Sequence, residues 1–168
     1  MQMDPAAISK AFTRAVSGSL EQLAFVEAIP MDENSPPLPD DLKPKPRTNV
    51  AWAQTPIVRP LEGDILMIMP PELGKMLTEI MFGGLGEGIV SDEVMLDAIA
   101  ETSNVIAGRV MNGLIGDNAE FELGLPQRGL GASDNDAPRL DAASFRLDYA
   151  IEGYTLTVIL GGGDFQTG

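Results

Sequence analysis

Near the amino terminus, hydrophobic residues recur every three or four positions from Ile8 to Leu23. This spacing is typical of one face of an amphipathic helix of roughly 20 residues. Asp4 precedes it as a good N-cap, and Pro5 takes the first helical position, where a missing N–H costs nothing. We expect the helix to end before Pro30.

The pattern disappears in the next stretch, residues 30–48, where six of the 13 prolines alternate with charged and polar residues. So few apolar side chains cannot offset the entropy lost on ordering the backbone. We interpret 30–48 as an exposed, partly extended connection within one domain.

Two strands and two helices are predicted next. The second strand is a nearly continuous apolar run, which indicates burial on both faces. Pro71 can open the first helix, and Ser91 caps the second, with Asp92 and Glu93 in its first turn, where the helix dipole favours negative charge. The predicted ranges are 49–58 and 64–69 for the strands, 71–81 for a helix ending at Gly83-Gly84, and 92–115 for a helix ending at Gly116.

The last third alternates apolar and polar residues, which is typical of strands. We predict strands over 119–125, 144–151 and 154–160, the last two joined by a tight turn at Glu152-Gly153, with a polar loop over 128–141. Residues 161–168 are predicted to form a flexible tail. The fold class is therefore α/β: one domain over residues 1–168, in the order α-β-β-α-α-β-β-β, with a mainly antiparallel sheet and two long helices packed on it.

The chain is acidic, with 25 Asp and Glu against 11 Lys and Arg and a formal net charge of −14. Such a surface repels nucleic-acid backbones and anionic lipid headgroups, so we expect neither nucleic acid nor membrane as a partner. A solvated acidic face explains the charge without any function, although the charge can also select a basic partner.

The chain has no Cys and no His. Disulfides, thiol nucleophiles, Ser-His-Asp triads and zinc sites built on those ligands are therefore excluded. The amino terminus lacks the basic start and apolar run of a signal peptide, and no apolar stretch approaches the roughly 20 residues of a membrane span. We expect a cytoplasmic protein.

The helix over 92–115 separates its side chains sharply. At about 100° per residue, its large apolar residues share one face, and Asp97, Glu101, Asn104 and Gly108 fall within an arc of about 60° on the other. A carboxylate and a carboxamide three residues apart are neighbours that one partner group can meet. Any surface helix shows polar residues opposite its apolar face, so the pattern alone does not establish a function.

The stretch Asp97-Ala-Ile-Ala-Glu101-Thr-Ser-Asn104-Val-Ile-Ala-Gly108 closely resembles the [Asp/Ser]-x-x-x-Glu-x-x-Asn signature of the CheC/CheX/FliY-type phosphatases. The stretch ending in Gly124-Leu125-Pro126-Gln127 and the element order resemble CheX-like members of that family. The resemblance implies a CheX-like domain over nearly the whole chain.

The resemblance also implies roles. Glu101 and Asn104 are the expected catalytic residues: Asn104 orients the water that attacks an aspartyl phosphate on a CheY-like response-regulator receiver domain, and Glu101 pairs with a lysine of that receiver. Asp97, Val105 and Gly108 are expected to contact the partner. The chain shows no metal-binding cluster of its own, so no cofactor is expected on it, and Mg²⁺ is expected in the receiver. The family resemblance also predicts a homodimer.

The complete motif occurs on only one helix, and a function without catalysis is the alternative. The first helix carries only Ser17-x-x-x-Glu21-x-x-Ala24, without an amide, so we expect a single active site per chain. The rival function is a non-catalytic docking or dimerisation module of the same fold in chemotaxis, flagellar or two-component signalling. A small-molecule enzyme is disfavoured, because no cluster of titratable residues or phosphate-binding loop is present.

Overall fold

In the computed structural model, residues 3–24, 26–31, 36–41, 43–83, 90–140 and 144–165 are described. The three predicted helices are confirmed, and their ends follow the capping signals: Asp4 Oδ1 accepts a hydrogen bond from the Ala6 amide, and Ser91 Oγ accepts one from the Val94 amide. The helices are α1 (Pro5–Ala24), α2 (Pro71–Met81) and α3 (Asp92–Ile115).

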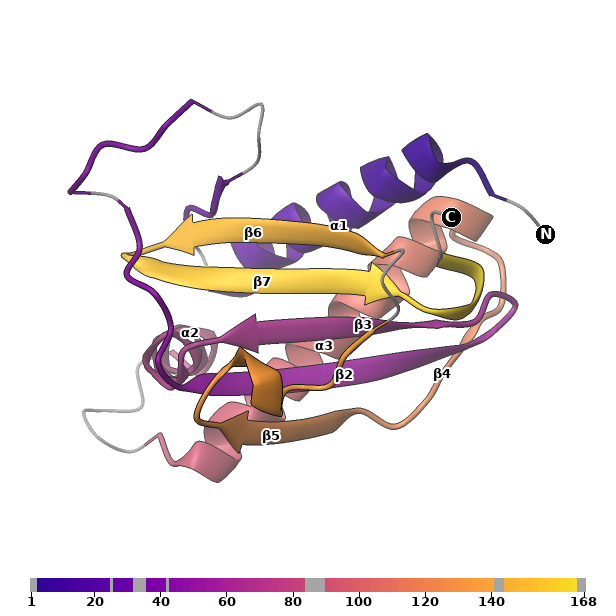
Figure 1. The fold of residues 1–168 in the computed structure, drawn as a ribbon. Coiled ribbons are helices and arrows are strands. Elements are labelled where there is room, and N and C mark those ends of the chain that lie inside the picture. Colours follow the sequence, from indigo (N-terminus) through magenta and orange to yellow (C-terminus); the bar gives the residue numbers. More distant parts are fainter. Residues whose placement is uncertain are drawn as a thin grey trace.

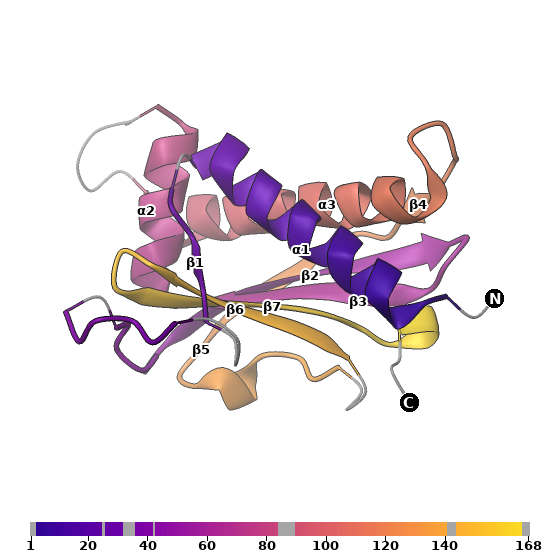
Figure 2. The ribbon, with the colours of Figure 1, turned by 90° about the horizontal axis from the view of Figure 1, so that it is seen from above.

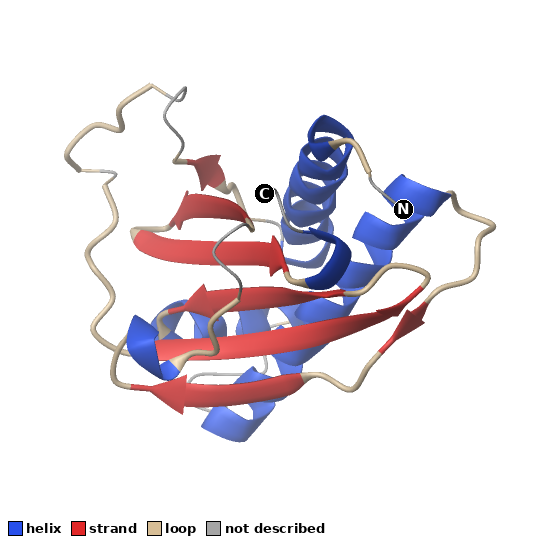
Figure 3. Cartoon of the chain, turned by 45° about the vertical axis from the view of Figure 1, so that its right-hand side comes forward, coloured by secondary structure: helices blue, strands red, loops and turns tan. Residues whose placement is uncertain are grey.

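The strands form one antiparallel sheet in the order β1-β6-β7-β3-β2-β4, and β5 also pairs with β2 (Figures 1 and 3). The predicted α/β class, the antiparallel sheet and the order of the main elements are therefore confirmed. The strands are β1 (Ile29–Pro30), β2 (Val50–Arg59), β3 (Gly63–Met69), β4 (Glu122–Leu123), β5 (Gln127–Gly131), β6 (Phe145–Ile151) and β7 (Tyr154–Gly161).

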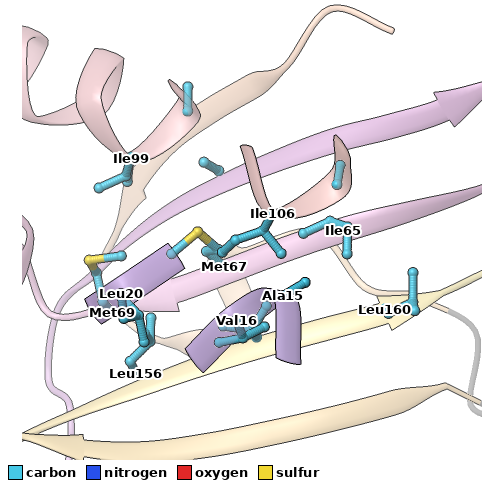
Figure 4. Packing of buried hydrophobic residues seen from close by; sticks show 14 of the residues in the cluster. Ala15, Val16, Leu20, Ile65, Met67, Met69, Ile99, Ile106, Leu156 and Leu160 are labelled. Atoms are coloured by element: carbon cyan, nitrogen blue, oxygen red, sulfur yellow. The ribbon is translucent and has the colours of Figure 1, made fainter. Parts of the chain in front are cut away.

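All three α-helices lie on the same face of the sheet (Figure 2). The main core fills the space between them, with Val16 and Leu20 from α1 and Ile106 from α3 packed over Met67 and Leu156 of the central strands (Figure 4). Strand β3 is buried on both faces, as its apolar run predicted, because its alternate side chains enter a smaller cluster on the other side of the sheet.

That second face is partly covered by the segment after β5, which includes a short 3₁₀ turn at Asp134–Asp136. Arg47 holds it there. The Arg47 guanidinium donates to both carboxylate oxygens of Asp134, to the Ile68 and Thr155 carbonyls and to Thr157 Oγ1. Hydrogen bonding from Arg47 lowers the pKa of the Asp134 carboxyl.

The prediction that residues 30–48 form an exposed connection is wrong at both ends of this range. Pro30 belongs to β1, which pairs with β6, and the Arg47 side chain is only 6% exposed. The sequence pattern missed these anchors because both depend on groups distant in the chain. The described residues between them, such as Pro36 and Lys45, are mostly exposed. Residues 32–35 and 42 of this connection lie outside the described residues.

The strand predicted over 119–125 contracts to β4, and the first part of the predicted loop over 128–141 is a strand, β5. Backbone pairing with β2, from Gln127 opposite Gln54 to Gly131 opposite Val50, produces β5 without an alternating apolar pattern. At Gly129 an added Cβ would lie 2.7 Å from the Trp52 ring, so the absent side chain permits this close approach.

The prediction of a flexible tail over residues 161–168 is wrong for residues 161–165. Gly161 ends β7, and a 3₁₀ turn at Gly163–Phe165 then folds the Phe165 ring into the main core, where it is fully buried. Residues 166–168 lie outside the described residues. A single aromatic among glycines has no periodicity, so the pattern could not reveal this burial.

Candidate functional site

Helix α3 is fixed on the sheet by apolar packing and by one buried polar contact. Ser103 Oγ and Thr55 Oγ1 of β2 are 2.8 Å apart, and both residues are fully buried. This hydrogen bond fixes the rotation of α3 about its axis. The next residue, Asn104, is turned by about 100° toward the side away from the core.

The structure places Glu101 and Asn104 on the face of α3 opposite its buried side, as the helical pattern predicted. Glu101 is exposed and Asn104 is half-buried. The Asn104 side-chain oxygen is itself buried and has no hydrogen-bond partner among the described residues. An unpaired buried polar atom costs about 1–3 kcal/mol, and such atoms in native proteins need an explanation.

Asp97 also lies on the exposed face of α3, and its carboxylate is paired within the chain. The guanidinium of Arg128, from β5, forms an ion pair with Asp97 and a second one, at 2.9 Å, with Glu93. Arg128 also donates to the Glu93 carbonyl. These contacts join the first turns of α3 to the edge strand of the sheet.

Val105 and Gly108 are both half-buried on this face. An aromatic ring flanks Gly108, because an added Cβ there would lie 3.7 Å from Cζ of Phe121. This is an ordinary contact distance, so the structure does not require glycine at this position. A partner approaching Gly108 would meet the Phe121 ring as well.

Sequence reasoning missed the residues that border this face along one side. Phe121 lies next to Gly108, and Arg128 is paired with Asp97. The segment from Phe121 to Arg128 therefore runs beside α3. Leu125 lies in this segment and is 88% exposed, the most exposed of the large apolar residues described. Leu125 belonged to the predicted strand over 119–125, but β4 ends at Leu123 and leaves it outside the strand.

The described residues contain no group of three or more acidic side chains placed to hold a metal ion. Within the same ranges, no helix has both the length and the apolar character needed to cross a membrane. The chemistry available at this face is therefore that of a carboxylate, a carboxamide with an unpaired oxygen, and their neighbours.

The antiparallel sheet, the three helices on one face and the Glu-x-x-Asn on the outer side of the longest helix agree with the expected CheC/CheX/FliY-type domain. The family model for the chemotaxis phosphatase CheX matches residues 53–145, more than half of the chain, including the whole of α3. The chain belongs to the CheX family. No curated protein matches it significantly in sequence.

Solved structures agree with this assignment at the level of the fold. CheX of Vibrio vulnificus has a TM-score of 0.69 at 15% identity, covering 95% of this chain and 99% of that one. The CheX–CheY–BeF3–Mg²⁺ complex of Borrelia burgdorferi contains a match with a TM-score of 0.67 at 17% identity, covering 90% and 95%. FliY of Thermotoga maritima is more distant, with a TM-score of 0.54 at 16% identity over 96% and 93%.

Proposed function

We propose that the chain dephosphorylates the aspartyl phosphate of a CheY-like receiver domain, with Asn104 and Glu101 as its catalytic residues. Membership of the CheX family supports the activity, and the Borrelia burgdorferi complex, in which a related CheX binds CheY, supports the partner. The observation that carries the proposal is the unpaired, buried oxygen of Asn104 on an exposed helix face.

An amide suits this reaction because its oxygen accepts a hydrogen bond while its NH₂ donates. When Asn104 enters the receiver's site, its oxygen accepts from a water molecule and orients that water toward phosphorus. The water oxygen then bonds to phosphorus, the bond from phosphorus to the aspartate oxygen breaks, and the products are inorganic phosphate and a free carboxylate. Positioning of this kind is the main requirement of phosphoryl transfer.

Glu101 lies one helical turn before Asn104, and its exposed side chain forms no ion pair within the described ranges. In the proposed complex it pairs with a lysine of the receiver and sets the register of the helix. Val105, Gly108 and the exposed Leu125 supply contact area around the pair, and so does Asp97, whose carboxylate stays largely exposed beside Arg128. Mg²⁺ belongs to the receiver, and the reaction takes place in the cytoplasm.

The test is phosphate release from a phosphorylated CheY-like receiver domain, measured for wild type, Asn104→Ala and Glu101→Ala. Loss of Asn104 should remove most of the acceleration while the affinity for the receiver stays nearly unchanged, because its contact acts in the transition state. Loss of Glu101 should also weaken binding, since a charge-assisted contact exists before the reaction.

Two matched controls separate these effects from general damage. Asn112→Ala removes an amide from the same helix two turns later, and Glu21→Ala removes the carboxylate of the incomplete motif on α1. Both controls should keep wild-type activity. If the wild-type protein binds the receiver tightly but never accelerates phosphate release, the chain is the alternative, a docking module without catalysis.

A further inference from the structure

A cationic groove lies between α1 and α3, the helix that carries Glu101 and Asn104. It has a volume of about 380 Å³, and its sides carry Lys10 and Arg14 from α1 and Arg109 from α3. Small residues form the rest of its lining: Ala7, Ala11, Ala15 and Gly113. Among the described residues that line it, none is acidic.

The two helices approach each other closely along this groove. An added Cβ at Gly113 would lie 3.2 Å from Cβ of Ala11, and one at Gly18 would lie 3.4 Å from an Arg109 nitrogen. Arg109 also donates to the Gln22 side-chain oxygen. Contact with α1 therefore positions the Arg109 guanidinium, which forms no ion pair with a carboxylate among the described residues.

The charge in this groove is unusual for the chain. Of its 11 Lys and Arg residues, six form salt bridges within the described ranges: Lys43, Arg47, Arg59, Lys75, Arg128 and Arg146. The groove holds three of the other five, and none of these three is neutralised by a carboxylate in the described part of the chain. A chain of net charge −14 thus has a local patch of positive charge without salt bridges in its described part.

We infer that this groove is a docking surface for the acidic rim of the receiver's phosphorylation site. The inference rests on the proposed function for the identity of the partner. An aspartyl phosphate and the carboxylates that hold Mg²⁺ make that rim anionic, and an acidic protein would otherwise repel it. Arg109 follows Glu101 by two helical turns, about 12 Å along α3, so one partner can span the groove and the Glu101–Asn104 face.

The experiment measures the association of a CheY-like receiver domain, loaded with BeF₃⁻ and Mg²⁺, with the full-length protein. The test variant is Lys10→Gln/Arg14→Gln, since both side chains are exposed and neither forms a salt bridge among the described residues. The control is Lys45→Gln/Arg139→Gln, which removes the same charge from exposed residues outside the groove. Circular dichroism checks that all variants fold.

We expect the groove variant to lower the association rate constant about tenfold at low salt, because charges beside an interface act mainly on encounter. The control should leave it nearly unchanged. Adding Arg109→Gln should lower it further. In about 1 M salt, where the screening length is about 3 Å, the variants should converge.

Equal rate constants for the groove variant and its control at low salt would overturn the inference while leaving the phosphatase proposal intact. Conversely, a groove effect together with undiminished phosphate release by Asn104→Ala would overturn the proposed mechanism and keep the docking surface. Failure of the wild-type protein to bind the receiver at all would overturn both.

Discussion

Arg128 of β5 forms an ion pair with Asp97 of α3 and so joins the sheet edge to the helix that carries Glu101 and Asn104. The same guanidinium holds Glu93, one turn earlier. Asp97, which was expected to contact a partner protein, thus also forms an ion pair within its own chain. The arginine of this pair lies in a segment that was predicted to be a loop. The pair orients the helix relative to the strand beside it.

We predict that Arg128→Met lowers the free energy of unfolding by about 0.5–1 kcal/mol, because both carboxylates are largely exposed and such pairs contribute little. A double-mutant cycle with Asp97→Asn, followed by urea denaturation, measures the coupling. Additive effects of the two substitutions would show that the pair does not contribute to the position of α3.

Asn104→Ala should raise the free energy of unfolding by about 0.5–1 kcal/mol. Alanine is the better helix former, and the substitution removes a buried oxygen that lacks a donor. Asn112→Ala changes the same residue type on the same helix without removing such an oxygen, so the difference between the two variants in urea denaturation isolates its cost. A loss of stability in Asn104→Ala would mean that the amide has a structural role.

Phe165→Ala should cost about 3–5 kcal/mol, since a fully buried ring leaves a cavity when it is removed. The exposed Leu125→Ala is the control and should change stability by less than about 0.5 kcal/mol. Thermal or urea denaturation measures both. Equal, small effects would place the carboxyl-terminal residues outside the core, as the glycine-rich sequence first indicated.

The ionisation of Asp134 should make the free energy of unfolding depend on pH in the acidic range. Because its pKa is lowered in the folded protein, its pairing with Arg47 contributes fully above the ordinary value of 3.8, and the contribution is lost as the pH falls through the lowered pKa. Asp134→Asn should therefore destabilise the protein at pH 7, and this destabilisation should shrink as the pH is lowered below 3.8. A destabilisation that grows as the pH is lowered below 3.8 would contradict this sign.

We also propose a homodimer. Within the described ranges, β1 covers only two residues of β6, so most of that strand presents an unpaired edge, which association can cover. Sedimentation at high micromolar concentration should give twice the chain mass of 17.9 kDa. A clean monomer mass would exclude the dimer.

Local patterns in the sequence determined the three helices with their caps, the doubly buried β3 and the β6–β7 hairpin. Each of these depends on neighbours within a few residues, where side-chain periodicity and backbone capping act directly. The same periodicity placed Glu101 and Asn104 together on the exposed face of one helix, because residues three apart on a helix are always neighbours.

Only the tertiary structure decided which distant segments of the chain contact one another. The short strand β5, the buried Arg47 and Phe165, the Arg128–Asp97 pair and the cationic groove all join segments far apart in the chain. Such contacts leave no periodic trace in the sequence, since they depend on which backbone edges and side chains meet after the core has packed. For the same reason the unpaired oxygen of Asn104 became visible only once its neighbours had been placed.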